Sequence, residues 1–346
     1  MPTNYIKNFD HNQFQAIYQK LDSARVQTKP LWFGTIYVGK EPLYVECHVK
    51  WLADKIEDYF VKTLPNQHIA GAKELYVLNN GTNEFIPMPD SWTTNVFWTG
   101  NNIYCQPDLI AHFNCIFGKW DNKYIISVDE SNPYNFYHLG ENHLLMKLFG
   151  YIFDTKDNII LHSAAIGNND FGVLITGLSG AGKSTLAAHC LKLGLKFISD
   201  DRVALHCEEG KVIANPIYTT ISLLEHIDGL KVKTSVHSNN STKDVIVLDK
   251  SHISESLTIN AIIEPVKSNS DTPVLQKVPK APVLTRICSD YSNFSLLTRS
   301  MNPLADYRKI SDLFTNIDAF SLQLSNSVED NAMAVFNFVT KGDVNV

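Results

Sequence analysis

Between residues 161 and 202, short apolar runs are separated by polar or glycine-rich stretches. The run Val173–Thr176 is rich in β-branched residues and too short for a helix, which predicts a buried parallel strand. Leu161–Ile166 and Leu195–Ser199 predict two further strands. Between Val173–Thr176 and Leu195–Ser199, apolar residues recur at helical spacing, at Leu186, Ala187, Cys190, Leu191 and Leu193. Gly194 follows them, where the C-terminal cap of a helix belongs. This succession predicts an α/β core.

The first part of the chain has a different pattern, rich in aromatic residues and in short alternating runs. Strands are predicted at Leu31–Val38, Ile103–Cys105, Cys115–Phe117 and Tyr124–Val128. A single helix is predicted where apolar residues are spaced by three and four, at Val49, Leu52, Ile56 and Phe60. We therefore divide the chain into residues 1–142, a mixed α/β, strand-rich domain for recognition or assembly, and residues 143–346, a second domain.

The pattern of the second domain continues to the end of the chain. His143–Phe153 predicts a buried helix and Val328–Val339 predicts another. Leu257–Glu264 predicts a strand that ends in a carboxylate. Two polar stretches, Lys231–Asp244 and Val266–Thr272, are interpreted as surface loops, with a substrate-ordered lid as the alternative.

Residues 177 to 185 match the motif G-x-x-x-x-G-K-[ST], known as the P-loop or Walker A motif, and lie between the predicted strand and helix. In such a loop, backbone N–H groups surround the β-phosphate of a nucleotide, the lysine contacts the β- and γ-phosphates, and the following hydroxyl binds Mg²⁺. The alternative is a glycine-rich turn without a ligand, but strand, loop and helix occur in the order that a phosphate site requires. The candidate nucleotide-binding residues are Gly177, Ser179, Gly180, Ala181, Gly182, Lys183, Ser184 and Thr185.

Two adjacent carboxylates, Asp200 and Asp201, follow the predicted strand Leu195–Ser199. At the carboxyl edge of a sheet they would lie beside the phosphates, where a carboxylate binds Mg²⁺ or accepts a proton from an attacking hydroxyl. A simple capping turn is the alternative. His162 is the single histidine on its predicted strand, and a lone histidine on an apolar strand is more often a core residue than a catalytic one.

In their order and residues, these three elements resemble the HPr kinase/phosphorylase superfamily, and within it the HPr-kinase-like serine kinases that act on peptide tails. The matching stretches are Leu161–Ala165, Gly172–Thr185 and Gly194 through Val203. The resemblance implies a P-loop kinase core of HPr-kinase type that uses ATP and Mg²⁺ to phosphorylate a serine hydroxyl.

The resemblance also implies roles for individual residues. Asp200 would be the base, Asp201 would support the metal or orient the substrate, and His162 would lie behind them, with Lys183 on the phosphates. Ser184 and Asp201 would bind the metal together with Glu225, although the arginine expected near Glu225 is missing. Glu264, at the end of its predicted strand, is a rival for the metal-supporting role.

The acceptor is not specified by these residues: a serine-containing peptide or protein and free serine all fit the resemblance. The basic loop that supports phosphate removal in bifunctional members has no match here, which favours a kinase without phosphorolysis. Members of the superfamily form rings, so a homo-oligomer is compatible with the resemblance.

Composition limits the other function classes. The 346 residues are 44% hydrophobic and 19% charged, as in an ordinary globular protein. The formal net charge is −6 and no basic tract occurs, which argues against a nucleic-acid partner. No signal-like or membrane-spanning apolar run occurs, so a cytoplasmic location without a membrane partner is expected. The six cysteines are dispersed, without a C-x-x-C pair, and are interpreted as core residues.

Other P-loop proteins were weighed against a kinase. The Leu-Ser-Gly-Gly signature of transporter-type ATPases and the Asn-Lys-x-Asp motif of GTPases are absent from the sequence. A P-loop ATPase of another kind and a non-catalytic nucleotide-sensing protein stay as alternatives.

Overall fold

The computed structural model describes residues 25–79, 158–178, 180–223, 244–294 and 303–342, the shorter stretches 94–99, 102–107, 115–120, 123–128 and 232–237, and a few isolated positions. The chain forms two compact units. The first comprises residues 1–37, 41–57 and 62–146, and the second comprises residues 38–40, 58–61 and 147–346. Within the described part of the chain, no helix is long and apolar enough to cross a membrane.

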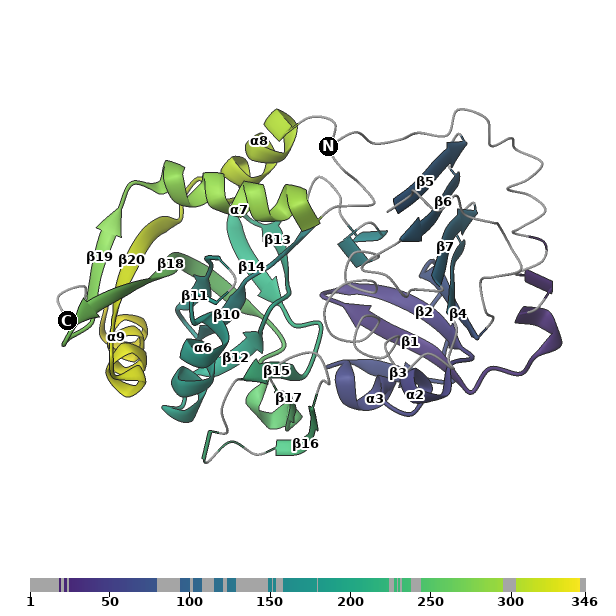
Figure 1. Cartoon of the computed structure of the whole chain (residues 1–346), viewed down its shortest axis with the longest axis horizontal. Helices are drawn as coiled ribbons and strands as arrows, with labels where there is room; N and C mark the ends of the chain where they lie inside the picture. Colours follow the sequence, from purple (N-terminus) through teal and green to yellow (C-terminus); the bar gives the residue numbers. More distant parts are fainter. Residues whose placement is uncertain are drawn as a thin grey trace. The chain divides into compact units, whose positions relative to one another are not determined.

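The N-terminal unit contains an eight-stranded sheet in the order β3-β1-β2-β4-β8-β7-β6-β5 (Figure 1). Its strands are β1 (Trp32–Val38), β2 (Glu41–Cys47), β3 (Thr63–Pro65), β4 (Lys73–Asn79), β5 (Thr94–Thr99), β6 (Asn102–Pro107), β7 (Cys115–Trp120) and β8 (Lys123–Val128). The strands β2, β4 and β8 are parallel neighbours, and β8, β7, β6 and β5 form an antiparallel succession. The predicted strands of this part are therefore confirmed.

The single helix predicted through Val49 and Phe60 is wrong. Two short helices occur instead, α2 (Lys50–Ala53) and α3 (Ile56–Tyr59), because the N–H of Lys55 donates to the carbonyl of Leu52 and ends the first helix after one turn. The four apolar residues of the pattern are nevertheless buried. Two separate helical turns bury the same four side chains that one continuous helix would bury, so the spacing alone does not distinguish the two structures.

The C-terminal unit is built on a nine-stranded mixed sheet, whose main order is β12-β10-β11-β18-β14-β13-β9. Its strands are β9 (Asn158–Leu161), β10 (Ala164–Gly167), β11 (Gly172–Ile175), β12 (Lys196–Ser199), β13 (Val203–Glu208), β14 (Lys211–Asn215), β18 (Leu257–Ser270), β19 (Val274–Val278) and β20 (Asp318–Ser325). The strand β11 is parallel to β18 and antiparallel to β10, so the predicted parallel strand is parallel on one side only. A separate three-stranded sheet, ordered β15-β17-β16, comprises β15 (Thr220–Leu223), β16 (Val232–His237) and β17 (Asp244–Leu248).

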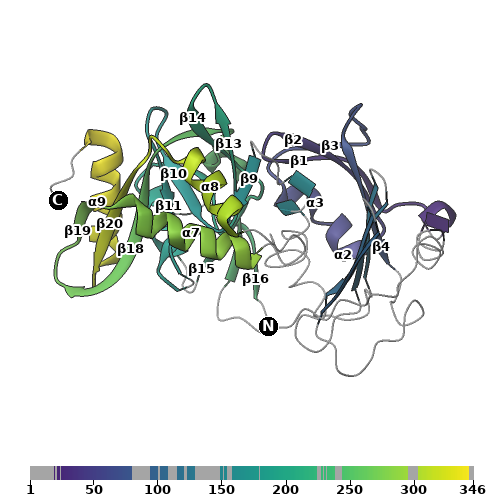
Figure 2. The ribbon, with the colours of Figure 1, turned by 90° about the horizontal axis from the view of Figure 1, so that it is seen from above.

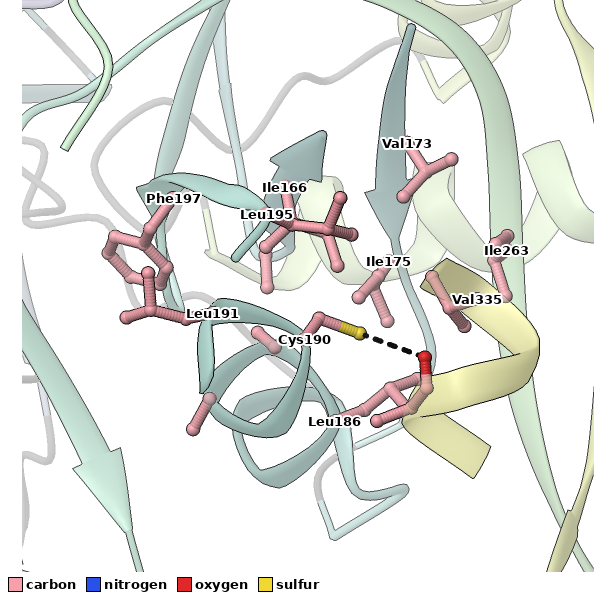
Figure 3. Close-up of a cluster of buried hydrophobic side chains, with 14 of the residues drawn as sticks. Ile166, Val173, Ile175, Leu186, Cys190, Leu191, Leu195, Phe197, Ile263 and Val335 are labelled. Atoms are coloured by element: carbon pink, nitrogen blue, oxygen red, sulfur yellow. Dashed lines mark hydrogen bonds between the residues drawn. The ribbon is translucent and has the colours of Figure 1, made fainter. Parts of the chain in front are cut away.

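Helices cover both faces of the large sheet. On one face lie α6 (Lys183–Lys192) and α9 (Val328–Lys341), and on the other lie α7 (Lys280–Phe294) and α8 (Pro303–Leu313), as Figures 1 and 2 show. Alternate residues of β11 serve the two layers, with Val173 and Ile175 toward α6 and Leu174 toward α7. The helix α6 packs its apolar face on this sheet, and the Sγ–H of Cys190 reaches the carbonyl of Ala332 on α9 (Figure 3). The predicted α/β class and the predicted final helix are confirmed.

Four segments differ from the sequence-based predictions. The strand predicted through Leu161–Ile166 is interrupted at His162, and the strand predicted to end at Glu264 continues as β18 to Ser270 because β20 pairs with it along that length. The supposed loop Val266–Thr272 is therefore mostly strand. In the supposed loop Lys231–Asp244, residues 232–237 form β16, and residues 238–243 lie outside the described part. Cys207 is exposed rather than a core residue, whereas Cys47, Cys190 and Cys288 are buried.

Candidate active site

The predicted phosphate loop follows β11 and leads into α6. The N–H of Thr176 still donates to the carbonyl of Ile263 on β18, over 3.0 Å, and the chain then leaves the sheet. Gly177, Gly180 and Gly182 adopt φ angles of +141°, +79° and +92°, which residues with a side chain rarely adopt. The glycines of the motif are thus required by the backbone path of the loop. Ser179 lies outside the described residues.

Lys183 is the first residue of α6 and its side chain folds back over the loop. Its Nζ donates to the carbonyl oxygens of Gly177, over 2.9 Å, and Leu178, over 3.3 Å. Ser184 and Thr185 follow in the first helical turn, half-buried. A cation, a helix N-terminus and a glycine loop therefore meet at one place, which is the arrangement that binds a polyphosphate.

The far end of α6 is held by the predicted glycine cap. Gly194 has φ +100°, its N–H donates to the carbonyl of Leu191, and the N–H of Leu195 donates to the carbonyl of Cys190. These two bonds form a Schellman motif, which ends the helix and sends the chain back into β12. Local sequence signals therefore position both ends of the helix that follows the loop.

The two carboxylates lie where one long strand pair is interrupted. The strands β9 and β10 follow each other closely in the chain, as do β12 and β13. β10 pairs with β12, and β9 pairs with β13, both antiparallel. Ala165 lies opposite Ser199 and Leu161 lies opposite Val203, so the same register continues across a gap of three residues in each strand. His162 falls in one gap and Asp200–Arg202 fills the other.

Asp201 has an unusual backbone in this gap. Its φ is +68°, and the N–H of Arg202 donates to the carbonyl of Asp200 over 2.8 Å. This is a γ-turn with positive φ at a residue other than glycine, a strained conformation that persists where the surrounding structure imposes it. The turn directs the Asp201 side chain toward His162, whose Nε2 lies 2.9 Å from Asp201 Oδ1.

The neighbours of Asp201 determine its acidity. Partial burial by itself raises the pKa of this carboxyl, but the Arg202 guanidinium, the His162 ring and the Lys183 ammonium together hold the pKa well below its ordinary value. Asp201 is therefore ionised across the neutral range. Ala164, which follows the gap at His162, lies opposite Ile175, which precedes the loop, so the His162–Asp201 pair and the phosphate loop lie at the same end of the sheet.

Asp200 has different surroundings, although it is the next residue. It is 6% exposed, and its Oδ2 accepts the backbone N–H of Ser222 on β15 over 3.0 Å. Asp200 therefore connects the large sheet to the small one, whereas Asp201, with 28% of its side chain exposed, contacts His162. Asp200 and Asp201 thus occupy distinct environments.

Glu264 lies on the other side of the phosphate loop. It follows Ile263, the residue of β18 opposite Ile175, and a Cβ built on Gly177 would lie 3.9 Å from the Cγ of Glu264. Glu264 is 9% exposed and forms an ion pair with Arg286 of α7. The loop is thus flanked by a carboxylate on each side. Glu225, the other candidate from the sequence, lies outside the described residues.

The residues present fit a nucleotide phosphate with its cation better than a free metal ion. In the part of the chain that the structure describes, no group of three or more histidine, cysteine, aspartate or glutamate side chains is arranged to hold a metal ion. A Cβ on Gly180 would meet no atom within 4 Å, so the loop has open space beside its backbone. Hydroxyl and carboxylate oxygens at Ser184 and Asp201 are the ligand types that Mg²⁺ prefers when phosphates supply the rest of the shell.

The structure thus brings together most residues chosen from the sequence. His162 and Asp201 are in contact at the end of the sheet where the loop with Lys183 begins, and Glu264 lies beside Gly177 of that loop. The sequence-based predictions did not include the bond from Ser222 to Asp200 or the role of Arg202 in holding the turn at Asp201. Arg202 was detectable, since it directly follows the carboxylates, but Ser222 and the Glu264 partner Arg286 carry no signal in the sequence.

Parts of the chain are similar in sequence to known proteins. The chain is 30% identical over 103 residues to the HPr kinase/phosphorylase of Clostridium tetani, covering 28% of this chain and 34% of that protein. It is 38% identical over 65 residues to the HPr kinase/phosphorylase of Clostridium botulinum strain Eklund 17B, covering 19% and 21%. The match to the HPr kinase/phosphorylase of Limosilactobacillus reuteri is 30% over 91 residues, covering 26% and 28%.

The chain therefore spans about a third or less of the length of these relatives. A solved structure, the Hpr(Ser) kinase/phosphatase from Coxiella burnetii, matches with a TM-score of 0.30 and 12% identity over 53% of this chain and 89% of that one. No family model matches. The sequence similarities confirm the relation to the HPr kinase/phosphorylase superfamily that the motifs predicted.

Proposed function

We propose that this protein is an ATP-dependent kinase that phosphorylates a serine hydroxyl. One observation carries the proposal: the phosphate loop leaves β11 after Ile175, the residue opposite Ala164, so the loop and the His162–Asp201 pair lie at the same end of the sheet. Phosphoryl transfer needs mainly positioning and charge neutralisation, and these groups supply both. Partial similarity to HPr kinase/phosphorylases supports the same reaction class.

In the proposed reaction, the loop and Lys183 hold the polyphosphate of ATP. When bound, Mg²⁺ would neutralise charge on the β- and γ-phosphates, and Ser184 and Asp201 are its proposed ligands. The low pKa of Asp201 keeps it ionised and suited to that role. His162 fixes the Asp201 carboxylate by the 2.9 Å contact between them.

For the transfer step, the serine oxygen forms a bond to the γ-phosphorus while the bond from that phosphorus to the bridging oxygen of ADP breaks. We propose that the serine proton passes to Asp200. This assignment has a structural condition, because the Asp200 carboxylate is buried and bonded to the N–H of Ser222. The segment Thr220–Leu223 must therefore move away from Asp200 when the acceptor binds.

The acceptor is proposed to be a serine-containing peptide or protein, with free serine as the small-molecule alternative. We assign acceptor recognition to the N-terminal part, residues 1–142, and nucleotide binding to residues 143–346. Transfer is proposed to run from ATP to serine without efficient removal of the phosphate by inorganic phosphate.

Nucleotide binding is tested by isothermal titration of the full chain with ATP and Mg²⁺. Lys183→Ala should severely weaken binding, whereas Lys192→Ala, an exposed lysine at the other end of the same helix, should bind like wild type. Equal affinities in wild type and Lys183→Ala would remove the nucleotide from the proposed loop.

Transfer is tested with γ-phosphate-labelled ATP and a panel of serine peptides, HPr-like phosphocarriers and free serine. Asp200→Asn should keep ATP binding and lose transfer by roughly a hundredfold or more, the usual scale for loss of a general base. Normal transfer by Asp200→Asn with loss in Asp201→Asn would move the base to the His162–Asp201 pair. Binding of ATP without any transfer would favour a nucleotide sensor, and hydrolysis without an acceptor would favour a P-loop ATPase.

A further inference from the structure

The ion pair between Glu264 and Arg286 lies beside the phosphate loop and has no part in the reaction proposed above. Glu264 belongs to β18, the parallel neighbour of the strand that leads into the loop, and its Cγ lies next to Gly177. Gly177 is also the residue whose carbonyl accepts the Lys183 ammonium. The Arg286 guanidinium is bonded to the Glu264 carboxylate, so it reaches the start of the phosphate loop from α7, the helix on the other face of the sheet from α6.

The two partners of this pair differ in exposure. The side chain of Glu264 is 12% exposed, whereas that of Arg286 is 41% exposed. Arg286 therefore extends from α7 toward solvent, whereas the Glu264 carboxylate to which it is bonded is mostly buried. A guanidinium carries five N–H donors, and a single carboxylate oxygen does not use them all.

The guanidinium is not fully satisfied by this contact. Its Nε–H is enclosed, and within the described part of the chain it lacks a hydrogen-bond acceptor. Because Nε is enclosed, a ligand would meet the exposed part of this 41% exposed side chain. A planar fork of donors beside a polyphosphate loop matches the geometry of phosphate oxygens.

We propose that Arg286 binds the terminal phosphate of the nucleotide and that Glu264 positions it. This inference rests on the proposed function, since it requires ATP at the loop. Glu264 holds one edge of the guanidinium, and the remaining donors are presented to the γ-phosphate. Holding the arginine before ATP arrives lowers the ordering cost of binding, and keeping the pair intact avoids a buried unpaired carboxylate.

The proposal predicts a selective effect on ATP. In the full chain, Arg286→Ala should weaken ATP by roughly tenfold, the scale of one charged hydrogen bond, and leave ADP affinity unchanged. Glu264→Gln should weaken ATP less, because the arginine remains but loses its orientation. The double variant should resemble Arg286→Ala, since both changes act through one guanidinium.

The affinities are measured by titration calorimetry with ATP and with ADP, each with Mg²⁺, and thermal unfolding is recorded for every variant. Arg308→Ala, an exposed arginine on α8, is the matched control and should bind both nucleotides like wild type. Equal losses for ATP and ADP, or unchanged ATP affinity in Arg286→Ala, would overturn the inference while leaving the kinase proposal standing. Failure of the wild type to bind either nucleotide would overturn both.

Discussion

Replacement of Arg202 by methionine tests whether the strained turn at Asp201 is held by its neighbour. The Arg202 side chain is 6% exposed. Its Nη1 donates to the Asp201 carbonyl over 2.8 Å, and its Nη2 lies 3.8 Å from Asp201 Oδ2. Methionine keeps an unbranched apolar stem of similar length but removes both contacts.

The expected loss follows from these contacts. A hydrogen bond from a charged group contributes about 1.5–3 kcal/mol, and removing one partner of a buried ion pair costs about 3–5 kcal/mol. Asp201 is partly exposed and keeps its contact with His162, so the lower end of the ion-pair range applies. We expect Arg202→Met to reduce the free energy of unfolding of the C-terminal unit by about 3 kcal/mol. Burial raises the pKa of Asp201 and Arg202 is the largest influence that lowers it, so the same change should raise this pKa.

Urea unfolding followed by two signals measures the effect. All five tryptophans belong to the N-terminal unit, at Trp32, Trp51, Trp92, Trp98 and Trp120. Tryptophan fluorescence therefore monitors that unit as an internal control, and circular dichroism also monitors the C-terminal unit. Arg202→Lys, which keeps the charge, should lose less stability. An unchanged dichroism transition in Arg202→Met would refute the argument that Arg202 holds the turn.

Three further predictions concern stability. The depressed pKa of Asp201 contributes stability that is present above its ordinary value of 3.8 and is lost as the pH falls below it, so Asp201→Asn should show a shallower loss than wild type in acid unfolding curves. Gly172→Ala should lower the free energy of unfolding strongly in thermal unfolding, because a Cβ there would lie 2.4 Å from the Thr258 carbonyl oxygen. Gly180→Ala, with open space but φ +79°, should lower it by only about 1 kcal/mol of backbone strain. Asn331→Ala should reduce the unfolding free energy by about 2 kcal/mol in denaturant titrations, because it removes two hydrogen bonds to the buried backbone of Ser325; an unaltered midpoint would contradict this.

Local signals in the sequence were sufficient for the elements of the phosphate loop. The apolar run before Gly177, the glycines and the helical spacing after Lys183 are contiguous, and the backbone angles they require are set by neighbouring residues. The cap at Gly194 was predictable for the same reason. Predictions failed where pairing between distant strands decided the outcome. Strand β18 continues past Glu264 because β20 pairs with it, and no local feature near Glu264 signals that pairing.

The sequence by itself therefore determined which chemical groups this protein carries and the local frame of its phosphate loop. Tertiary structure alone decided how those groups differ. The two adjacent carboxylates are equivalent in the sequence, yet the positive φ of Asp201 directs one to His162, and β15 buries the other. The partner of Glu264, Arg286, was likewise assigned only by the packing of α7 on the sheet. The physical reason is that burial and charge pairing depend on residues far apart in the chain, which local patterns do not encode.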